Sequence, residues 1–165
     1  MNEQLNNLIE ALREELKQYG EMLALLDQEQ QLVIERQAAG IAPCVAAINA
    51  QAETLQAVRR ERDQRRRHLA RTLQLCEDVS FRDLTGRLPV QYKPLLDALV
   101  DENKELLVRV QQRARQNHLL LSRMVELMQK LITSILPGTG PSTYSDSGVL
   151  QAPSLPSQPL YDAIG

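Results

Sequence analysis

The stretch from residue 5 to residue 33, LNNLIEALREELKQYGEMLALLDQEQQLV, decides the fold class. Mostly apolar side chains recur in it at alternating steps of four and three residues: Leu5, Ile9, Leu12, Leu16, Tyr19, Leu23 and Leu26, then Gln30 and Val33. Such a heptad repeat predicts a long helix that packs lengthwise against another helix. Gly40 and Pro43 follow it. Because Gly favours the position beyond a helix end and Pro interrupts the hydrogen-bond ladder, we expect the first helix over residues 3–38.

The same spacing resumes after this break and predicts a second helix over residues 43–78. The apolar positions of the resumed repeat are Ile41, Val45, Ile48, Ala52, Leu55, Leu69, Leu73 and Cys76. Two long helices joined by a short connection form an antiparallel hairpin. Ser80-Phe81-Arg82-Asp83 then has the form of a capping box that opens a short helical turn ending at Gly86, so we expect a connector there.

A third helix is predicted over residues 94–136, because Pro94 is tolerated in a first helical turn and Pro137-Gly138 ends the apolar pattern. Residues 137–165 hold five of the eight prolines and no Lys or Arg, a composition that buries too little apolar surface to fold. Aromatic residues make up only 3% of the chain, which disfavours a β-sandwich or barrel. We therefore expect an all-α protein: a three-helix antiparallel bundle over residues 1–136, with a long third helix, and a flexible, disordered tail over 137–165.

The sequence also bears on where the protein is located and on the state of its two cysteines. The start, Met1-Asn2-Glu3-Gln4, lacks the basic residues and apolar run of a signal peptide, and no window of about twenty residues is free of charge. We therefore expect a cytoplasmic protein that does not insert into a membrane. Cys44 and Cys76 lie too far apart along one helix for a disulfide, so both thiols are expected to be free.

A run of basic residues dominates the second helix: Arg59, Arg60, Arg62, Arg65, Arg66, Arg67, His68 and Arg71. Clustered arginines can neutralise nucleic-acid phosphates. In the predicted hairpin, however, this run lies opposite Glu14, Glu15 and Glu21, and no aromatic residues interleave with it to stack bases. The net charge of −2 adds no overall attraction. We expect arginines paired inside the chain and no nucleic-acid partner.

The candidate site lies in residues 119–136, where eleven of eighteen residues are apolar. Arg123, Glu126 and Lys130 exclude a membrane span, and so wide an apolar face needs more than one neighbouring helix. Two interpretations stay open: a groove for an amphipathic helix of a client protein, or a surface covered by the bundle core or by a second copy in a homodimer. The candidate client-binding residues are Leu120, Leu121, Met124, Val125, Met128, Leu131, Ile132 and Ile135.

The sequence contains no pattern of residues that is typical of a catalytic site. His68 and His118 lie far apart, neither belongs to a spaced set of metal ligands, and no Gly-rich phosphate loop occurs. We expect no enzyme activity, no cofactor and no metal site.

Several short motifs carry a family resemblance. Asn117-His118-Leu119-Leu120-Leu121 precedes the apolar helix end, Thr143-Tyr144 and Gly148 follow in the tail, and Leu160, Asp162 and Ala163 lie near the terminus. Together with the helix order, they resemble the FlgN-like family of flagellar type III export chaperones. The resemblance implies a cytosolic bacterial chaperone that binds hook-filament junction (hook-associated) proteins by their terminal helical segments, keeps them soluble and delivers them to the export gate, a membrane protein. It also implies that the tail tyrosine, here Tyr144, docks at that gate. The heptads alone leave an alternative, a coiled-coil scaffold or adaptor in another assembly.

Overall fold

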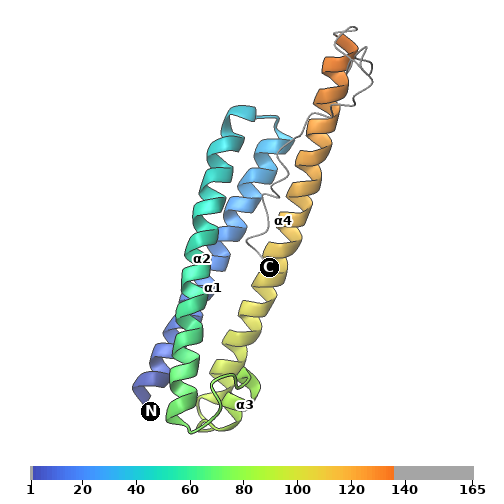
Figure 1. The fold of residues 1–165 in the computed structure, drawn as a ribbon. Coiled ribbons are helices and arrows are strands. Elements are labelled where there is room, and N and C mark those ends of the chain that lie inside the picture. The colour runs from blue at the N-terminus through green and yellow to red at the C-terminus, as the bar shows by residue number, and fades with distance from the viewer. Residues whose placement is uncertain (1, 136–165) are drawn as a thin grey trace, which may run out of the picture. The chain divides into compact units, whose positions relative to one another are not determined.

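The computed structural model describes residues 2–135, which form four helices (Figure 1): α1 (Asn2–Ile34), α2 (Ala38–Thr72), α3 (Phe81–Gly86) and α4 (Lys93–Ile135). No strand occurs among these residues, so the all-α prediction is confirmed. The count of three helices is wrong, because the connector forms a helix of its own. The Ser80 hydroxyl accepts a hydrogen bond from the Asp83 amide at 3.2 Å and caps the start of α3. The tail predicted over residues 137–165 lies outside the described residues.

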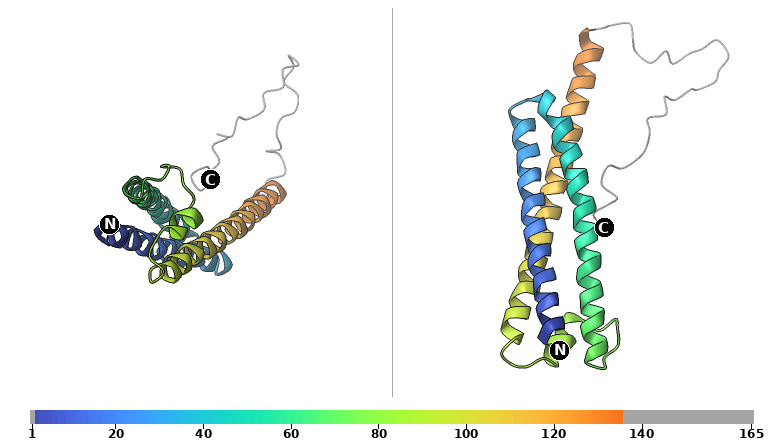
Figure 2. Two further views of the ribbon diagram at one scale, coloured as in Figure 1. Left: turned by 90° about the horizontal axis from the view of Figure 1, so that it is seen from below. Right: turned by 90° about the vertical axis from the view of Figure 1, so that its left-hand side faces the viewer.

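The chain divides into two compact units, residues 1–117 and residues 118–165, called here the bundle unit and the terminal unit. The bundle unit contains α1, α2, α3 and α4 as far as Asn117. Within it, α1 and α2 lie side by side and run in opposite directions, as the two views of Figure 2 show. They form the antiparallel hairpin that the heptads predict. Of the terminal unit, the structure describes residues 118–135, the last part of α4.

Both hairpin helices end earlier than predicted, at Ile34 and Thr72 rather than at residues 38 and 78. Two residues beyond each end, a residue other than Gly adopts the left-handed conformation: Arg36 with φ 58° and Gln74 with φ 57°. At each end the next amide, of Gln37 or Leu75, donates back to a carbonyl five residues earlier at 2.9 Å. This is the Schellman arrangement, in which Gly is the usual residue. The ends were placed too late because neither position carries a glycine signal.

Gly40 has a different role from the predicted one. It does not end α1 but lies in the first turn of α2, and Pro43 lies inside that helix near its start. A Cβ at position 40 would come within 2.8 Å of the Leu32 side chain. The missing side chain of Gly40 therefore leaves space for the Leu32 side chain beside the turn between α1 and α2.

All four helices contribute to a core at one end of the bundle unit. The start of α1, the end of α2, α3 and the start of α4 gather there (Figure 1). The buried residues of this cluster are Leu5, Leu8, Ile9, Leu12, Leu69, Ala70, Leu84, Leu88, Leu96, Leu99 and Val100. Their burial removes apolar side chains from all four helices from water and holds the elements of this end together.

The buried face of α1 follows the predicted repeat at five of its nine positions. Leu5, Ile9, Leu12, Tyr19 and Leu26 are buried as expected. At three other positions, Glu15, Met22 and Glu29 are buried in place of Leu16, Leu23 and Gln30, which are partly exposed. Polar partners that come much later in the chain stabilise the two buried carboxylates.

Helix α4 runs parallel to α1, and the residues that pair between the two helices have a constant separation in the sequence. The side-chain amide of Asn103 donates to the main-chain carbonyl of Leu12 at 3.0 Å, and that of Asn117 donates to the carbonyl of Leu26 at 2.7 Å. Both pairs are separated by 91 residues. Buried polar residues at repeated heptad positions fix the register of packed helices, so the two asparagines define how α4 aligns with α1.

Candidate functional site

The eight predicted client-binding residues all lie on α4, in the terminal unit. None of them is buried. Val125, Met128, Leu131, Ile132 and Ile135 are exposed, and Leu120, Leu121 and Met124 are partly exposed. The exposed fraction reaches 59% for Leu131 and 73% for Ile135. Large apolar side chains left in water over several helical turns are typical of a binding surface.

These residues share one side of the helix. At about 100° per residue, the eight side chains fall within an arc of about 140° and extend about 22 Å along the axis. Leu127, which the predicted set omitted, adjoins this arc and is exposed. We call the nine residues together the apolar face. Leu119 is just as exposed as Leu131, at 59%, but it lies outside the face, about 80° around the helix from Leu127.

The two borders of the apolar face differ in charge. On one side, Arg123 precedes Leu127 by four residues and Lys130 follows it by three, so both cations are its surface neighbours. On the other side, Ser122 precedes Val125 by three residues and Gln129 follows it by four, and neither side chain carries a charge. These four border residues all lie in the described part of the terminal unit, residues 118–135.

A comparison with protein-family models matches residues 1–152 to the FlgN family, described as "FlgN protein". The match covers the bundle unit, the apolar face and part of the tail. The chain belongs to the FlgN family. Membership implies a role as a flagellar export chaperone, and the predicted resemblance is confirmed. Neither the curated proteins nor the solved structures contain a match to the chain.

The FlgN family is a family of chaperones and not of enzymes. Among residues 2–135, no helix is long and apolar enough to cross a membrane. The same residues contain no group of three or more His, Cys, Asp and Glu side chains arranged to hold a metal ion. Tyr144, the candidate for gate docking, lies outside the described residues.

Several arginines of residues 59–71 in this FlgN-family chain form hydrogen bonds with groups of the bundle unit itself. Arg62 donates to both carboxylate oxygens of Glu15 at 3.0 Å, and the Tyr19 hydroxyl donates to the same carboxylate at 3.2 Å. The predicted pairing is therefore confirmed for Glu15. It is wrong for the other two acids, because Glu14 accepts from Gln18 and Glu21 pairs with Lys17 on the exposed side of α1.

The guanidinium groups of Arg62 and Arg66 also lie over the ring of Phe81, at 5.8 Å and 6.0 Å from its centroid. Arg66 donates to the main-chain carbonyls of Glu77 and Val79 in the segment between α2 and α3. These contacts fix that segment against α2. Sequence reasoning missed Phe81 as a partner, because a single aromatic residue in a connector has no periodic signal.

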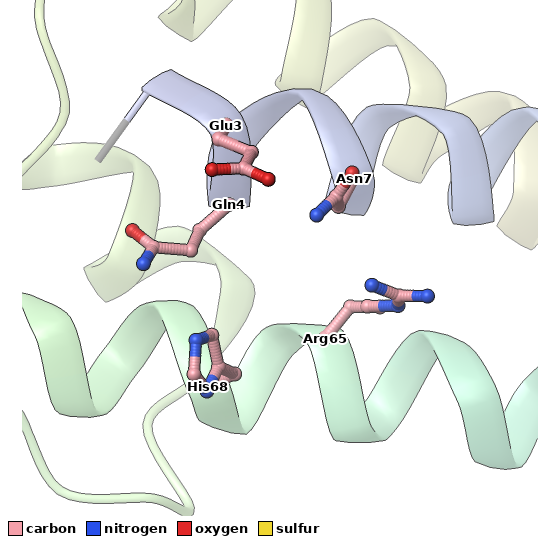
Figure 3. Close-up of a pocket in the computed structure, with 5 residues that line it drawn as sticks. All are labelled: Glu3, Gln4, Asn7, Arg65 and His68. Carbon is pink, nitrogen blue, oxygen red and sulfur yellow. The ribbon is translucent and has the colours of Figure 1, made fainter.

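A small polar hollow of about 280 Å³ lies between α1 and α2, at the core end of the bundle unit. Figure 3 shows Gln4 and Asn7 of α1 facing His68 and Arg65 of α2, with Glu3 at the rim. The hollow contains one imidazole and no nucleophile beside it. Its residues provide no arrangement for acid–base or covalent catalysis.

Proposed function

We propose that the apolar face of α4 binds the terminal helical segment of a hook-associated protein and keeps that segment from aggregating in the cytosol. The observation that carries the proposal is the exposure of the face over residues 120–135 in a chain of the FlgN family. A hook-associated protein needs such cover, because a terminal amphipathic helix has an apolar side that stays in water until it assembles.

The chemistry of the face suits a helical client. An amphipathic helix laid along it would remove apolar side chains of both partners from water, and each fully buried Leu, Ile or Met contributes on the order of 2 kcal/mol. Met124 and Met128 have flexible thioether side chains that adapt to more than one client surface. No bond is made or broken, so release needs only a competitor with higher affinity for the client or the chaperone.

Delivery is the second half of the proposal. Tyr144 follows α4 in the sequence, and we assign it to docking at the membrane export gate on the basis of the family resemblance. Tyrosine combines a large apolar ring with a hydroxyl and has few rotamers to immobilise. We expect Tyr144→Ala to leave the affinity for the client within about threefold while it weakens binding of the loaded chaperone to the gate. Unchanged gate binding and secretion in this variant would exclude Tyr144 from delivery.

The test of client binding compares two leucines of equal exposure. Leu131 lies on the apolar face and Leu119 lies about 120° around the helix from it, yet both are 59% exposed. We expect Leu131→Glu to weaken binding of a hook-associated protein's terminal segment more than tenfold in titration calorimetry, and Leu119→Glu to change it less than threefold. Both variants should keep the wild-type helicity by circular dichroism. Equal effects of the two substitutions would contradict a binding face on this side of α4.

A further inference from the structure

The charge difference between the two borders of the apolar face points to a further property of the client. Arg123 and Lys130 form what we call the cationic edge. They are seven residues apart and therefore lie on the same side of α4, about two helical turns from each other. Both side chains are exposed.

Within residues 2–135, the cationic edge has no ion-paired counter-ion. In the part of the chain that the structure describes, neither Arg123 nor Lys130 makes an ion pair, although Glu126 lies between them in the sequence. Some other exposed cations among these residues do pair with a carboxylate on their own helix, Arg65 with Glu61 and Lys104 with Asp101, whereas Arg60 and Arg67 do not. No described carboxylate therefore forms an ion pair with the two charges beside the apolar face.

We propose that the cationic edge selects client helices whose apolar stripe is bordered on one side by carboxylates. The inference rests on the proposed function, since it concerns a helix lying on the same face. Charges that flank an apolar contact between helices set partner choice and orientation more than they add affinity. With cations on one border and the uncharged Ser122 and Gln129 on the other, only one side of the bound helix meets an attractive field. A helix with lysines on that side would meet like charges instead.

The test uses the full-length protein and two synthetic amphipathic peptides with the same stripe of Leu, Ile and Met. One peptide carries two Glu, and the other two Lys, seven residues apart along one border of the stripe. At low ionic strength we expect the Glu peptide to bind about tenfold more tightly, from two exposed ion pairs gained and two repulsions avoided. The difference should shrink as salt screens the charges.

Two double variants complete the test. Arg123→Glu with Lys130→Glu should reverse the preference, so that the Lys peptide binds more tightly. Arg60→Glu with Arg67→Glu is the matched control, because these exposed α2 arginines have the same spacing of seven residues and the substitution changes the net charge equally. We expect the control to keep the preference of the wild type.

The outcomes separate the two proposals. Binding of both peptides with equal affinity, or an equal loss of preference in the control variant, would overturn the cationic edge while leaving client binding intact. Failure of both peptides and of the hook-associated segment to bind would overturn the proposed function, and the present inference with it.

Discussion

Asn117 donates hydrogen bonds to two groups of α1, the main-chain carbonyl of Leu26 at 2.7 Å and the buried carboxylate of Glu29 at 2.8 Å. Glu29 and Asn117 are both fully buried. Arg113 of α4 also binds Asp27 and Gln30 of α1, but neither of these side chains is buried. Asn117 is therefore the α4 partner of the buried Glu29 carboxylate. Its removal leaves the buried Glu29 carboxylate without this donor, whereas the Leu26 carbonyl lies inside α1 and keeps its hydrogen bond within the helix.

We expect Asn117→Ala to lower the free energy of unfolding by about 2–3 kcal/mol, because buried polar groups that lose their partner keep the full cost of desolvation. Urea unfolding followed by circular dichroism measures this. The matched control is Gln116→Ala, whose side chain is exposed and should change stability by less than about 0.5 kcal/mol. Similar losses in both variants would contradict a structural role for the Asn117 bonds.

Arg62 is the partner of the buried Glu15 carboxylate, which is 1% exposed. We expect Arg62→Ala to destabilise the bundle by about 3 kcal/mol, because it leaves that charge unpaired. Arg65→Ala breaks the exposed pair with Glu61 instead and should cost less than about 1 kcal/mol. The double substitution Glu15→Leu with Arg62→Leu removes both charges and should recover most of the loss. A double variant no more stable than Arg62→Ala would argue against charge burial as the cause.

Tyr19 makes stability depend on alkaline pH. Burial, and next the neighbouring Glu15 carboxylate, raise the pKa of the Tyr19 hydroxyl from 10.0 to about 12. Since the folded-state pKa is the higher one, the unfolded chain loses this proton first, and the stabilisation present below pH 10 is lost as pH rises towards 12. We expect the wild type to lose stability relative to Tyr19→Phe over this interval. A difference between the two that stays constant with pH would contradict the shift.

The left-handed residues at the ends of α1 and α2 offer a route to higher stability. Arg36 and Gln74 have φ values of 58° and 57°, where a side chain costs about 1 kcal/mol relative to Gly. We expect Arg36→Gly and Gln74→Gly each to raise the melting temperature by a few degrees. Arg36→Ala and Gln74→Ala retain the Cβ and should give no gain. Destabilisation by both glycines would mean that these side chains do more than cover the helix ends.

The class of the fold and the location of the apolar face followed from apolar periodicity, because each depends on local spacing. The buried positions of α1 followed only in part. Glu15 and Glu29 occupy core positions through partners 47 and 88 residues away, Arg62 and Asn117, and no local pattern encodes such pairs. The local pattern therefore favours Leu16 over Glu15 as a core residue. Likewise, the predicted ends of α1 and α2 are wrong, because the Schellman turns at Arg36 and Gln74 contain no Gly and so leave no signal in the sequence.

The offset of 91 residues between α1 and α4 bears on the order in which the protein folds. Only three residues connect α1 to α2, so the contacts between these two helices can form one after another, starting beside this short loop. Pairing Asn103 with Leu12 must instead close a loop of most of the bundle unit, whose entropic cost is the greater one. We expect the hairpin to form first and α4 to dock on it last, in the slower phase that contacts distant in sequence impose. During synthesis, then, the ribosome releases the hairpin well before the helix that completes it.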